Sequence, residues 1–492
     1  FYVDKTAQIY QLATTGKYYF LSRPRRFGKS LLISTIEAYF QGKKELFNGL
    51  AMETLEKEWI EYPILHLDLN AEKYDAPERL DAILNDALCT WEKLYGRVSS
   101  ETTFSLRFKG IIQRAAEKTG RGVVVLVDEY DKPLLQAIGN NVLQTDFRDT
   151  LKAFYGVLKS SDRYIRFALL SGVTKFSKIS VFSDLNNLED LSLQPNYQTL
   201  CGISHQELTS LLSEEIKGLA DKHNKTVNEM LTQLTEWYDG YHFSSKGEGI
   251  YNPFSLLQVM KQSEFGSYWF ETGTPIFLVE LLKKSRYPLV ELEKTIVTAD
   301  ILGGIDFIEE NPIPILYQSG YLTIKDYNTE FQTYTLGFPN REVEDGFTRW
   351  LLPYYTAIQK SESSAEIVYL IQEIRSGKID SFMHRLQSFF ADTPYELVRD
   401  LELHYQNVLF IIFKLLGFYT QAEYHTSQGR IDLLVKTDKY IYVMEFKLDG
   451  TAEQALQQIN EKQYAQPFAT DSRTIYKIGA NFSNKTKGLE QW

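Results

Sequence analysis

The chain is poor in cysteine and lacks long apolar runs, and both absences narrow its class. Its 492 residues contain only two cysteines, Cys89 and Cys201, which are too far apart for a disulfide framework or a CxxC metal site. The apolar stretch 408–418 is shorter than the roughly 20 residues of a membrane span and includes Lys414. No signal peptide is visible, although the chain begins at Phe1 without Met. We therefore expect a cytoplasmic protein in a reducing compartment, with no membrane partner.

Positive charge and histidine pairs are also scarce. The formal net charge of −11 argues against a generally basic nucleic-acid coat, so any such contact requires a local basic patch. The seven histidines form no ligand-spaced pair, and zinc is therefore not expected. What is present is ordinary globular composition, with 43% hydrophobic and 24% charged residues. A chain of this length predicts two to four domains.

Short apolar runs alternate with amphipathic stretches over the first 200 residues. The run 123–127 is apolar at every position, as expected for a central strand that is buried on both faces. Helical periodicity lies between these runs. The alternation predicts an α/β fold with a parallel sheet covered by helices on both faces. The expected strands are 17–21, 63–69, 122–130 and 166–173.

The pattern changes three times after this region. Residues 205–300 are mostly helical, and 312–340 predict a helix end followed by a β-hairpin, which resembles a winged-helix segment. An α/β pattern starts again at about residue 400 and places strands at 430–436, 439–448 and 474–482. The expected divisions are an α/β core at 1–204, a helical lid with the winged-helix-like segment at 205–345, a helical linker at 346–399 and a small α/β domain at 400–492.

The stretch RPRRFGKS, residues 23–30, joins an expected strand to an expected helix that starts at about Lys29. A phosphate-binding loop needs this setting, because backbone N–H groups at a helix N-terminus point at phosphates and glycine allows close approach. Lys29 would neutralise phosphate charge, and the Ser30 hydroxyl would ligate Mg²⁺. We interpret Gly28, Lys29 and Ser30 as the centre of a nucleotide site.

A second element of such a site is an apolar strand that ends in acid, and VVVLVDE supplies it. Asp128 would hold the Mg²⁺ shell, and Glu129 would polarise the attacking water. The alternative without a nucleotide site is a basic surface turn and an unrelated strand that ends in a solvated acidic pair. The correct order of both elements favours the nucleotide site.

The entrance of the loop differs from the usual glycine-rich form. Arg23 replaces glycine, so the turn cannot depend on a positive φ there, and Pro24 fixes the following backbone angle. Arg25 and Arg26 add positive charge. They either contact phosphate or form surface salt bridges, and the residues alone do not separate these alternatives.

A second acidic site is expected near the C-terminus. Asp432 lies on one expected strand, and Glu445 and Lys447 lie on one face of the next, because side chains alternate along a strand. Two carboxylates suit Mg²⁺, and a lysine can stabilise a phosphorane-like transition state. Glu402, on the preceding helix, could complete the metal shell. The alternative is two amphipathic strands with a charged solvent face.

Several stretches together carry a family resemblance. They include FLSRPRRFGKSLLISTIEAYF, VVVLVDEYDKP, SGVTKFSKISVFSDLNNLEDLS, WYDGYHF and GRIDLLV with YVMEFKLDGTAEQALQQI. Nearly the whole chain resembles a bacterial family in which a predicted AAA-type ATPase domain precedes a nuclease domain of the PD-(D/E)xK superfamily. The implied fold is a P-loop NTPase sheet with a lid, followed by a small restriction-endonuclease-like domain.

The resemblance also implies roles for individual residues. By this resemblance, RPRRFGKS is this family's own form of the phosphate loop. Arg25, Arg26 and Phe27 are then expected to contact ATP together with Gly28, Lys29 and Ser30. Thr174 falls where such ATPases carry a polar sensor. Asp432, Glu445 and Lys447 map onto the nuclease motif, with Glu402 and Gln458 on the flanking helices. Ile431 departs from the pattern, since it stands where the motif has proline.

Two functions are consistent with these sites. One is an ATP-regulated, Mg²⁺-dependent nuclease that acts on nucleic acid, with DNA as the favoured substrate. The other is a switch ATPase whose C-terminal domain only binds nucleic acid or a protein partner. The complete set of acids and lysine favours the nuclease, whereas the acidic net charge favours the switch. The sequence is compatible with a homo-oligomer but does not determine the oligomeric state.

Overall fold

The protein is described from a computed structural model, and it divides into two compact units. The first unit contains residues 1–272 and 294–341, and the second contains 273–293 and 342–492. Within the part of the chain that is described, none of the helices combines the length and apolar character needed to cross a bilayer. Side chains at 271, 277, 421–427 and 430–432 are not described. The described backbone covers residues 2–175, 187–271, 277–303, 311–356, 358–390, 401–417, 421–427 and 430–492.

A five-stranded sheet forms the centre of the first unit, and all its described pairings are parallel. The strand order is β2-β3-β4-β1-β5. Every residue of β3 is buried, as its apolar sequence predicts. The parallel α/β core expected from the sequence is therefore confirmed. The strands are β1 (Tyr18–Ser22), β2 (Ile64–Asp68), β3 (Val123–Asp128), β4 (Ile165–Gly172) and β5 (Glu189–Asp190).

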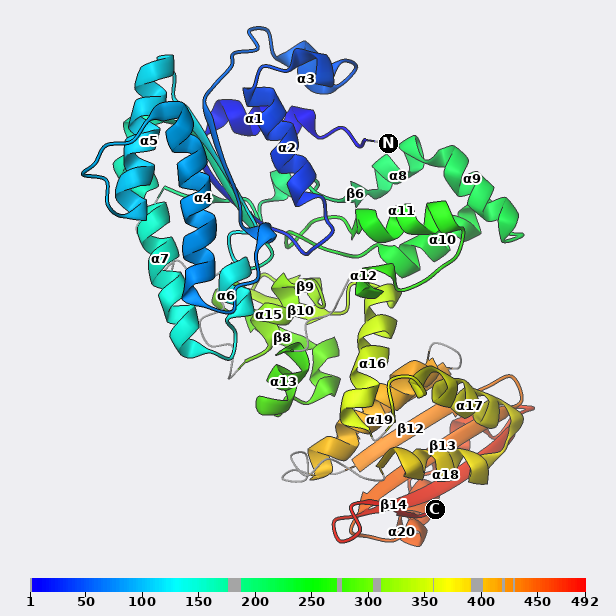
Figure 1. The fold of residues 1–492 in the computed structure, drawn as a ribbon. Helices are drawn as coiled ribbons and strands as arrows, with labels where there is room; N and C mark the ends of the chain where they lie inside the picture. The colour runs from blue at the N-terminus through cyan, green and yellow to red at the C-terminus, as the bar shows by residue number, and fades with distance from the viewer. Residues whose placement is uncertain are drawn as a thin grey trace. The chain divides into compact units, whose positions relative to one another are not determined.

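Helices cover this sheet on both faces. Figure 1 shows α4, α5 and α7 grouped on one side of the sheet and α1 and α2 on the other. Apolar residues at helical spacing are buried along these helices, for example Leu80, Leu84 and Leu88 in α4. The helices are α1 (Thr6–Thr15), α2 (Lys29–Phe40), α3 (Ala51–Leu55), α4 (Pro77–Tyr95), α5 (Phe104–Thr119), α6 (Lys132–Gln136) and α7 (Asn141–Ser160).

The rest of the first unit is a helical bundle and a small sheet. Two of the bundle helices, α8 and α10, begin with capping boxes at Ser204 and Thr226. The bundle encloses its own apolar core, which includes Leu208, Leu234 and Val259. Its elements are β6 (Ile203–Ser204), α8 (His205–Leu211), α9 (Ser213–Lys222), α10 (Val227–Tyr238), β7 (Ile250–Tyr251), α11 (Pro253–Gln262) and α12 (Tyr268–Glu271).

The predicted helix and hairpin at 312–340 are confirmed. A helix precedes an antiparallel hairpin, and a third strand pairs with the far edge to give the order β8-β10-β9. The elements are β8 (Thr295–Thr298), α14 (Ala299–Leu302), α15 (Ile313–Gln318), β9 (Thr323–Asn328) and β10 (Thr333–Gly337).

The second unit is built on a mixed five-stranded sheet in the order β11-β12-β13-β14-β15. Only the β13–β14 pair is parallel among its described pairings. The strands are β11 (Gln421–Ser427), β12 (Arg430–Lys436), β13 (Tyr440–Leu448), β14 (Thr474–Ser483) and β15 (Gly488–Gln491). The helices are α13 (Phe277–Lys284), α16 (Arg341–Tyr355), α17 (Ser363–Ser376), α18 (Ile379–Phe390), α19 (Leu401–Gly417) and α20 (Ala452–Glu461).

Helices upstream of residue 400 belong to this unit. The Tyr442 hydroxyl of β13 donates to the Ile374 carbonyl of α17 at 2.6 Å. Gln387 of α18 donates to the Leu489 carbonyl of β15 at 2.7 Å. The stretch 346–399, expected to act as a linker, therefore supplies helices that are hydrogen-bonded to the sheet.

Candidate functional site

The loop between β1 and α2 makes its turn at two left-handed residues. Gly28, the residue before α2, has φ +94°, and Arg26 has φ +67°. A Cβ built on Gly28 would meet no atom within 4 Å, so the space in front of the helix is open. The missing glycine at position 23 is thus compensated by a turn closer to the helix. The backbone N–H groups at the start of α2 are left facing this open space.

Lys29 lies at the centre of the loop with its ammonium group held by oxygen atoms. Nζ donates to the carbonyl of Arg23 at 3.1 Å and to that of Pro24 at 3.4 Å. It also lies 3.4 Å from Glu129 Oε1, although the residue is only 4% exposed. A phosphate group that enters the loop would therefore compete with Glu129 for the same cation.

Ser30 and Asp128 meet at the end of β3. The Ser30 hydroxyl donates to Asp128 Oδ2 at 2.7 Å, and the Ser171 hydroxyl of β4 donates to Oδ1 at 2.7 Å. Asp128 is 5% exposed. Sequence reasoning omitted Ser171, although it stands in the same SGVT stretch as the expected sensor. A hydroxyl and a carboxylate at this separation are oxygen ligands of the kind that Mg²⁺ prefers.

Glu129 occupies a backbone conformation that costs free energy. Its φ is +50°, in the left-handed region that non-glycine residues seldom adopt. The turn points its carboxylate toward Lys29 and keeps it partly exposed to solvent. Such strain is common at catalytic positions, where the surrounding structure holds it in place.

Asp131 is a buried acid that sequence reasoning did not assign. Its carboxylate accepts hydrogen bonds from the Thr174 N–H at 2.6 Å and the Thr174 hydroxyl at 2.5 Å. Burial raises its pKa to about 7, and the charge of Glu129 adds to the rise. A Cβ on Gly172 would lie 2.4 Å from this carboxylate, so only glycine fits. The expected sensor Thr174 thus has its hydroxyl engaged by Asp131, and an aspartate three residues beyond Asp128 was the available signal.

Three side chains of the loop, expected near ATP, contact aromatic rings of the same unit. The Arg25 guanidinium lies 4.7 Å from the Trp269 ring centroid, and that of the exposed Arg26 lies 5.1 Å from Phe254. Phe27 is buried edge-on against Tyr241 and Phe243, with ring centroids 4.8 and 5.4 Å away. Cation–π contact is therefore a third alternative for the two arginines, beside phosphate contact and salt bridges.

The second candidate site lies where β12 and β13 pair. The antiparallel register places Asp432 directly opposite Glu445, as the predicted convergence requires. The side chain of Asp432 lies outside the described residues. The nuclease assignment of this position therefore depends on backbone register and motif order.

Glu445, Lys447 and Gln458 form a connected polar cluster. Lys447 Nζ lies 3.2 Å from Glu445 Oε1 and also donates to the Gln458 side-chain oxygen. The Gln458 amide nitrogen donates to Glu445 Oε1. Glu445 has no exposed surface, whereas the Lys447 side chain is 22% exposed. A buried carboxylate is held beside a solvent-reachable ammonium group, and both are fixed by an amide from α20.

Gly479 explains how α20 reaches this cluster. It pairs with Glu445 across β13 and β14, and a Cβ there would lie 2.2 Å from the Ala452 carbonyl and 2.5 Å from the Leu456 nitrogen. Only glycine allows the helix backbone to approach the strand this closely. The approach brings Gln458 within reach of Glu445.

In the described residues, neither Glu402 nor the nearby His404 is hydrogen-bonded to the cluster. Glu402 is exposed in the first turn of α19, and its carboxylate accepts a hydrogen bond from Gln406 at 3.4 Å. The structure gives it no hydrogen bond or ion pair to Glu445 or Lys447. His404 is buried, and burial lowers its pKa to about 4. Within the described residues, no group of three or more His, Cys, Asp or Glu side chains could hold a metal.

The fold and these two sites define a P-loop nucleotide-binding core joined to a nuclease-like sheet. Family comparison matches residues 1–182 to a predicted AAA-ATPase and residues 400–492 to the PD-(D/E)XK nuclease superfamily. A relative from Azotobacter chroococcum mcd 1, described as an uncharacterized protein in the vnfD 5' region, is 34% identical over 498 residues. The match covers 99% of this chain and 94% of the relative. The chain therefore belongs to the family that joins a predicted AAA-ATPase domain to a PD-(D/E)XK superfamily domain.

Proposed function

We propose that the protein hydrolyses ATP and uses the nucleotide state to control a Mg²⁺-dependent nuclease that acts on DNA. The observation that carries the proposal is the convergence of four residues from two separate segments on one open loop: Lys29 and Ser30 at the start of α2, and Asp128 and Glu129 at the end of β3. Lys29 would hold the β- and γ-phosphates, and Ser30 with Asp128 would hold Mg²⁺, which neutralises phosphate charge when bound. Glu129 would orient the attacking water once phosphate releases it from Lys29.

A pocket beside the loop fits the nucleotide base. Its lining includes Phe27, Gly28, Leu31, Ile203 and Leu257. The walls are mostly apolar, as a heteroaromatic ring requires, and Gly28 connects them to the expected phosphate position. Leu31 and Leu257 are 54% and 40% exposed, which leaves apolar surface for a ligand to cover. We assign this pocket to the adenine of ATP.

Leu257→Ala is expected to weaken ATP binding about fivefold while binding of inorganic tripolyphosphate stays unchanged. The base would lose part of one leucine side chain, which amounts to about 1 kcal/mol of apolar contact. Titration calorimetry with both ligands provides the measurement. Leu106→Ala, at a similarly exposed leucine on α5, is the matched control. Equal losses for ATP and tripolyphosphate would refute the base assignment.

The C-terminal cluster supports nucleic-acid cleavage rather than binding alone. The carboxylate of Glu445 provides hard oxygen ligands and is fully buried. Asp432 lies opposite Glu445 in the pairing of β12 with β13. These two residues would hold Mg²⁺, which supplies Lewis-acid activation when bound. Lys447 would stabilise negative charge on the scissile phosphate, and Gln458 would keep the lysine and the carboxylate in position. Glu402 remains a candidate ligand that would have to turn toward the metal.

The function is tested by cleavage of plasmid DNA and of RNA by the full chain, with and without Mg²⁺. We expect DNA to be cleaved, and ATP to change the rate about tenfold, which corresponds to about 1.4 kcal/mol of coupling. Rates are compared without nucleotide, with ATP, with a non-hydrolysable analogue and in the Lys29→Ala variant. Equal rates in all four cases would refute the coupling. ATP hydrolysis without cleavage of either nucleic acid would instead favour a switch ATPase whose C-terminal domain only binds.

A further inference from the structure

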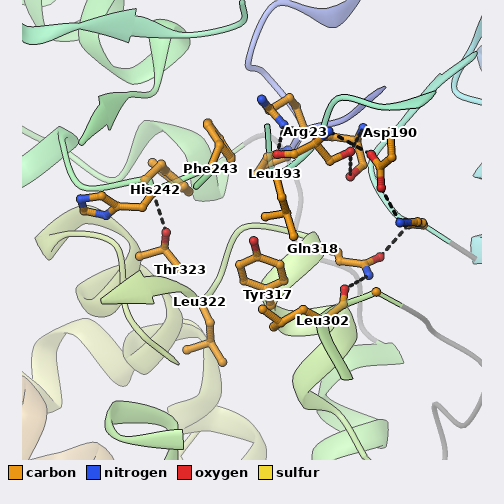
Figure 2. Close-up of a pocket in the computed structure, with 16 residues that line it drawn as sticks. Arg23, Asp190, Leu193, His242, Phe243, Leu302, Tyr317, Gln318, Leu322 and Thr323 are labelled. Carbon is orange, nitrogen blue, oxygen red and sulfur yellow. Dashed lines mark hydrogen bonds and ion pairs between the residues drawn. The ribbon is translucent and has the colours of Figure 1, made fainter. Parts of the chain in front are cut away.

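A second pocket lies in the first unit beside the start of the phosphate loop. Ser22, Arg23 and Pro24 of the loop line it, but Gly28, Lys29 and Ser30 do not. Figure 2 shows the other walls, which come from the end of β5, the turn 241–243 and the segment from α15 to β9. The cavity encloses about 50 Å³. That is space for roughly three to four water molecules, or for one small polyatomic group.

Arg23 brings an unneutralised positive charge to this pocket. It is 1% exposed, and it donates three hydrogen bonds, to the carbonyls of Ser22, Ser192 and Tyr197. Its guanidinium carbon lies 4.0 Å from the Phe243 ring centroid. Since a guanidinium carries five N–H donors, two remain, and Nε is without an acceptor in the described structure.

The acid lining the same pocket does not neutralise Arg23. Asp190 is ion-paired with Lys175, which also lines the pocket, and it acts on Arg23 only through space. Among the described residues, no carboxylate lies within ion-pairing distance of Arg23. Burial lowers the pKa of Arg23, because the cation has lost water without gaining an anion. A buried cation is costly unless it is paired, so the pocket is electrostatically prepared for a negative ligand.

The remaining walls favour a small oxyanion. Figure 2 shows the Tyr317 hydroxyl directed toward Leu193 and Arg23. Burial raises the pKa of Tyr317, so its hydroxyl stays protonated and can donate. Gln318 is held at both ends, since Oε1 accepts from the Lys175 N–H at 2.6 Å and Nε2 donates to the Leu302 carbonyl at 2.7 Å. The pocket thus has a rigid side wall and donors at one end.

We propose that this pocket binds a small oxyanion, a phosphate or carboxylate group, between the Arg23 guanidinium and the Tyr317 hydroxyl. A guanidinium offers parallel N–H groups that match two oxygens of such a group. The carbonyl of Arg23 accepts the hydrogen bond from Lys29 Nζ. The ligand therefore holds the residue that positions the catalytic lysine, and the pocket is an effector site separate from the proposed ATP site.

The test measures the melting temperature of the full chain carrying Lys29→Ala, which removes the ammonium group that phosphate would contact in the loop. Inorganic phosphate and acetate are compared with chloride at equal ionic strength. We expect phosphate or acetate to raise the melting temperature by a few degrees. The stronger of the two identifies the oxyanion class, and glycerol 3-phosphate then separates free phosphate from a phosphate ester.

Two further substitutions, each added to Lys29→Ala, test whether the rise in melting temperature comes from this pocket. Tyr317→Phe removes one donor, and Leu193→Trp fills the cavity from its rim, where Leu193 is 36% exposed and a larger ring is tolerated. Both should abolish the rise, whereas Tyr164→Phe, at a tyrosine outside the pocket, should retain it. No rise with either anion, or an equal rise in all three variants, would overturn the proposal.

Discussion

Lys29→Ala is expected to lower the affinity for ATP about 100-fold while leaving the fold intact. The buried ammonium group now shared between two loop carbonyls and Glu129 is the one cation that the described loop directs to its own centre. Its charge-assisted bonds to phosphate are worth about 1.5–3 kcal/mol each, and 1.4 kcal/mol changes a dissociation constant tenfold. Alanine suits the first turn of α2, and Glu129 is exposed enough to be solvated without its partner.

Binding is measured by calorimetry at a fixed Mg²⁺ concentration, and circular dichroism checks the fold. Lys44→Ala, at an exposed lysine shortly after α2, is the matched control and should bind as the wild type does. Glu129→Gln extends the test, because it should bind ATP and hydrolyse it about 100-fold more slowly. An unchanged affinity in Lys29→Ala would show that the loop does not bind phosphate.

The elements of both units follow from local patterns, which is why the sequence could predict them. The structure of the apolar strand β3, of Gly28 before α2 and of Lys29 and Ser30 at the start of α2 depends on neighbouring residues and on burial. Lys29, Ser30, Asp128 and Glu129 meet because parallel strands place their carboxyl ends at one edge of a sheet. The adjacency of two strands with a short connection predicted that Asp432 and Glu445 would converge, and the antiparallel register of the structure places the two residues opposite each other.

The features that the sequence did not predict depend on contacts between side chains that are far apart in the chain. Arg25 could meet a phosphate or a surface acid, and nothing near it in sequence indicates Trp269, more than 240 residues away. Asp131 is an ordinary acid in sequence and becomes distinctive only because Gly172, at the end of β4, and Thr174, just after it, lie against its carboxylate. The sequence predicted a linker where α17 and α18 lie, because an apolar helix face does not indicate which sheet it packs against. Tertiary packing determines these contacts, and local propensity does not predict tertiary packing.

Glu445→Gln is expected to reduce DNA cleavage at least about 100-fold and to leave ATP hydrolysis unchanged. The substitution keeps the size of the side chain and an oxygen that can accept from Gln458, but it removes the negative charge needed to hold a metal ion. It also deprives Lys447 of the anion 3.2 Å away, so the lysine would be less well positioned at the scissile phosphate.

Cleavage is measured on plasmid DNA, with ATP turnover measured in the same preparation. Glu461→Gln, at the exposed end of α20, removes an equal charge from the helix that carries Gln458 and should cleave as the wild type does. Retained ATP turnover shows that the first unit is intact, and an unchanged melting temperature shows the same for the second. If Glu445→Gln cleaved DNA at the wild-type rate, the cluster on β13 and α20 would be a structural ion pair, and the cleavage would have to come from another site.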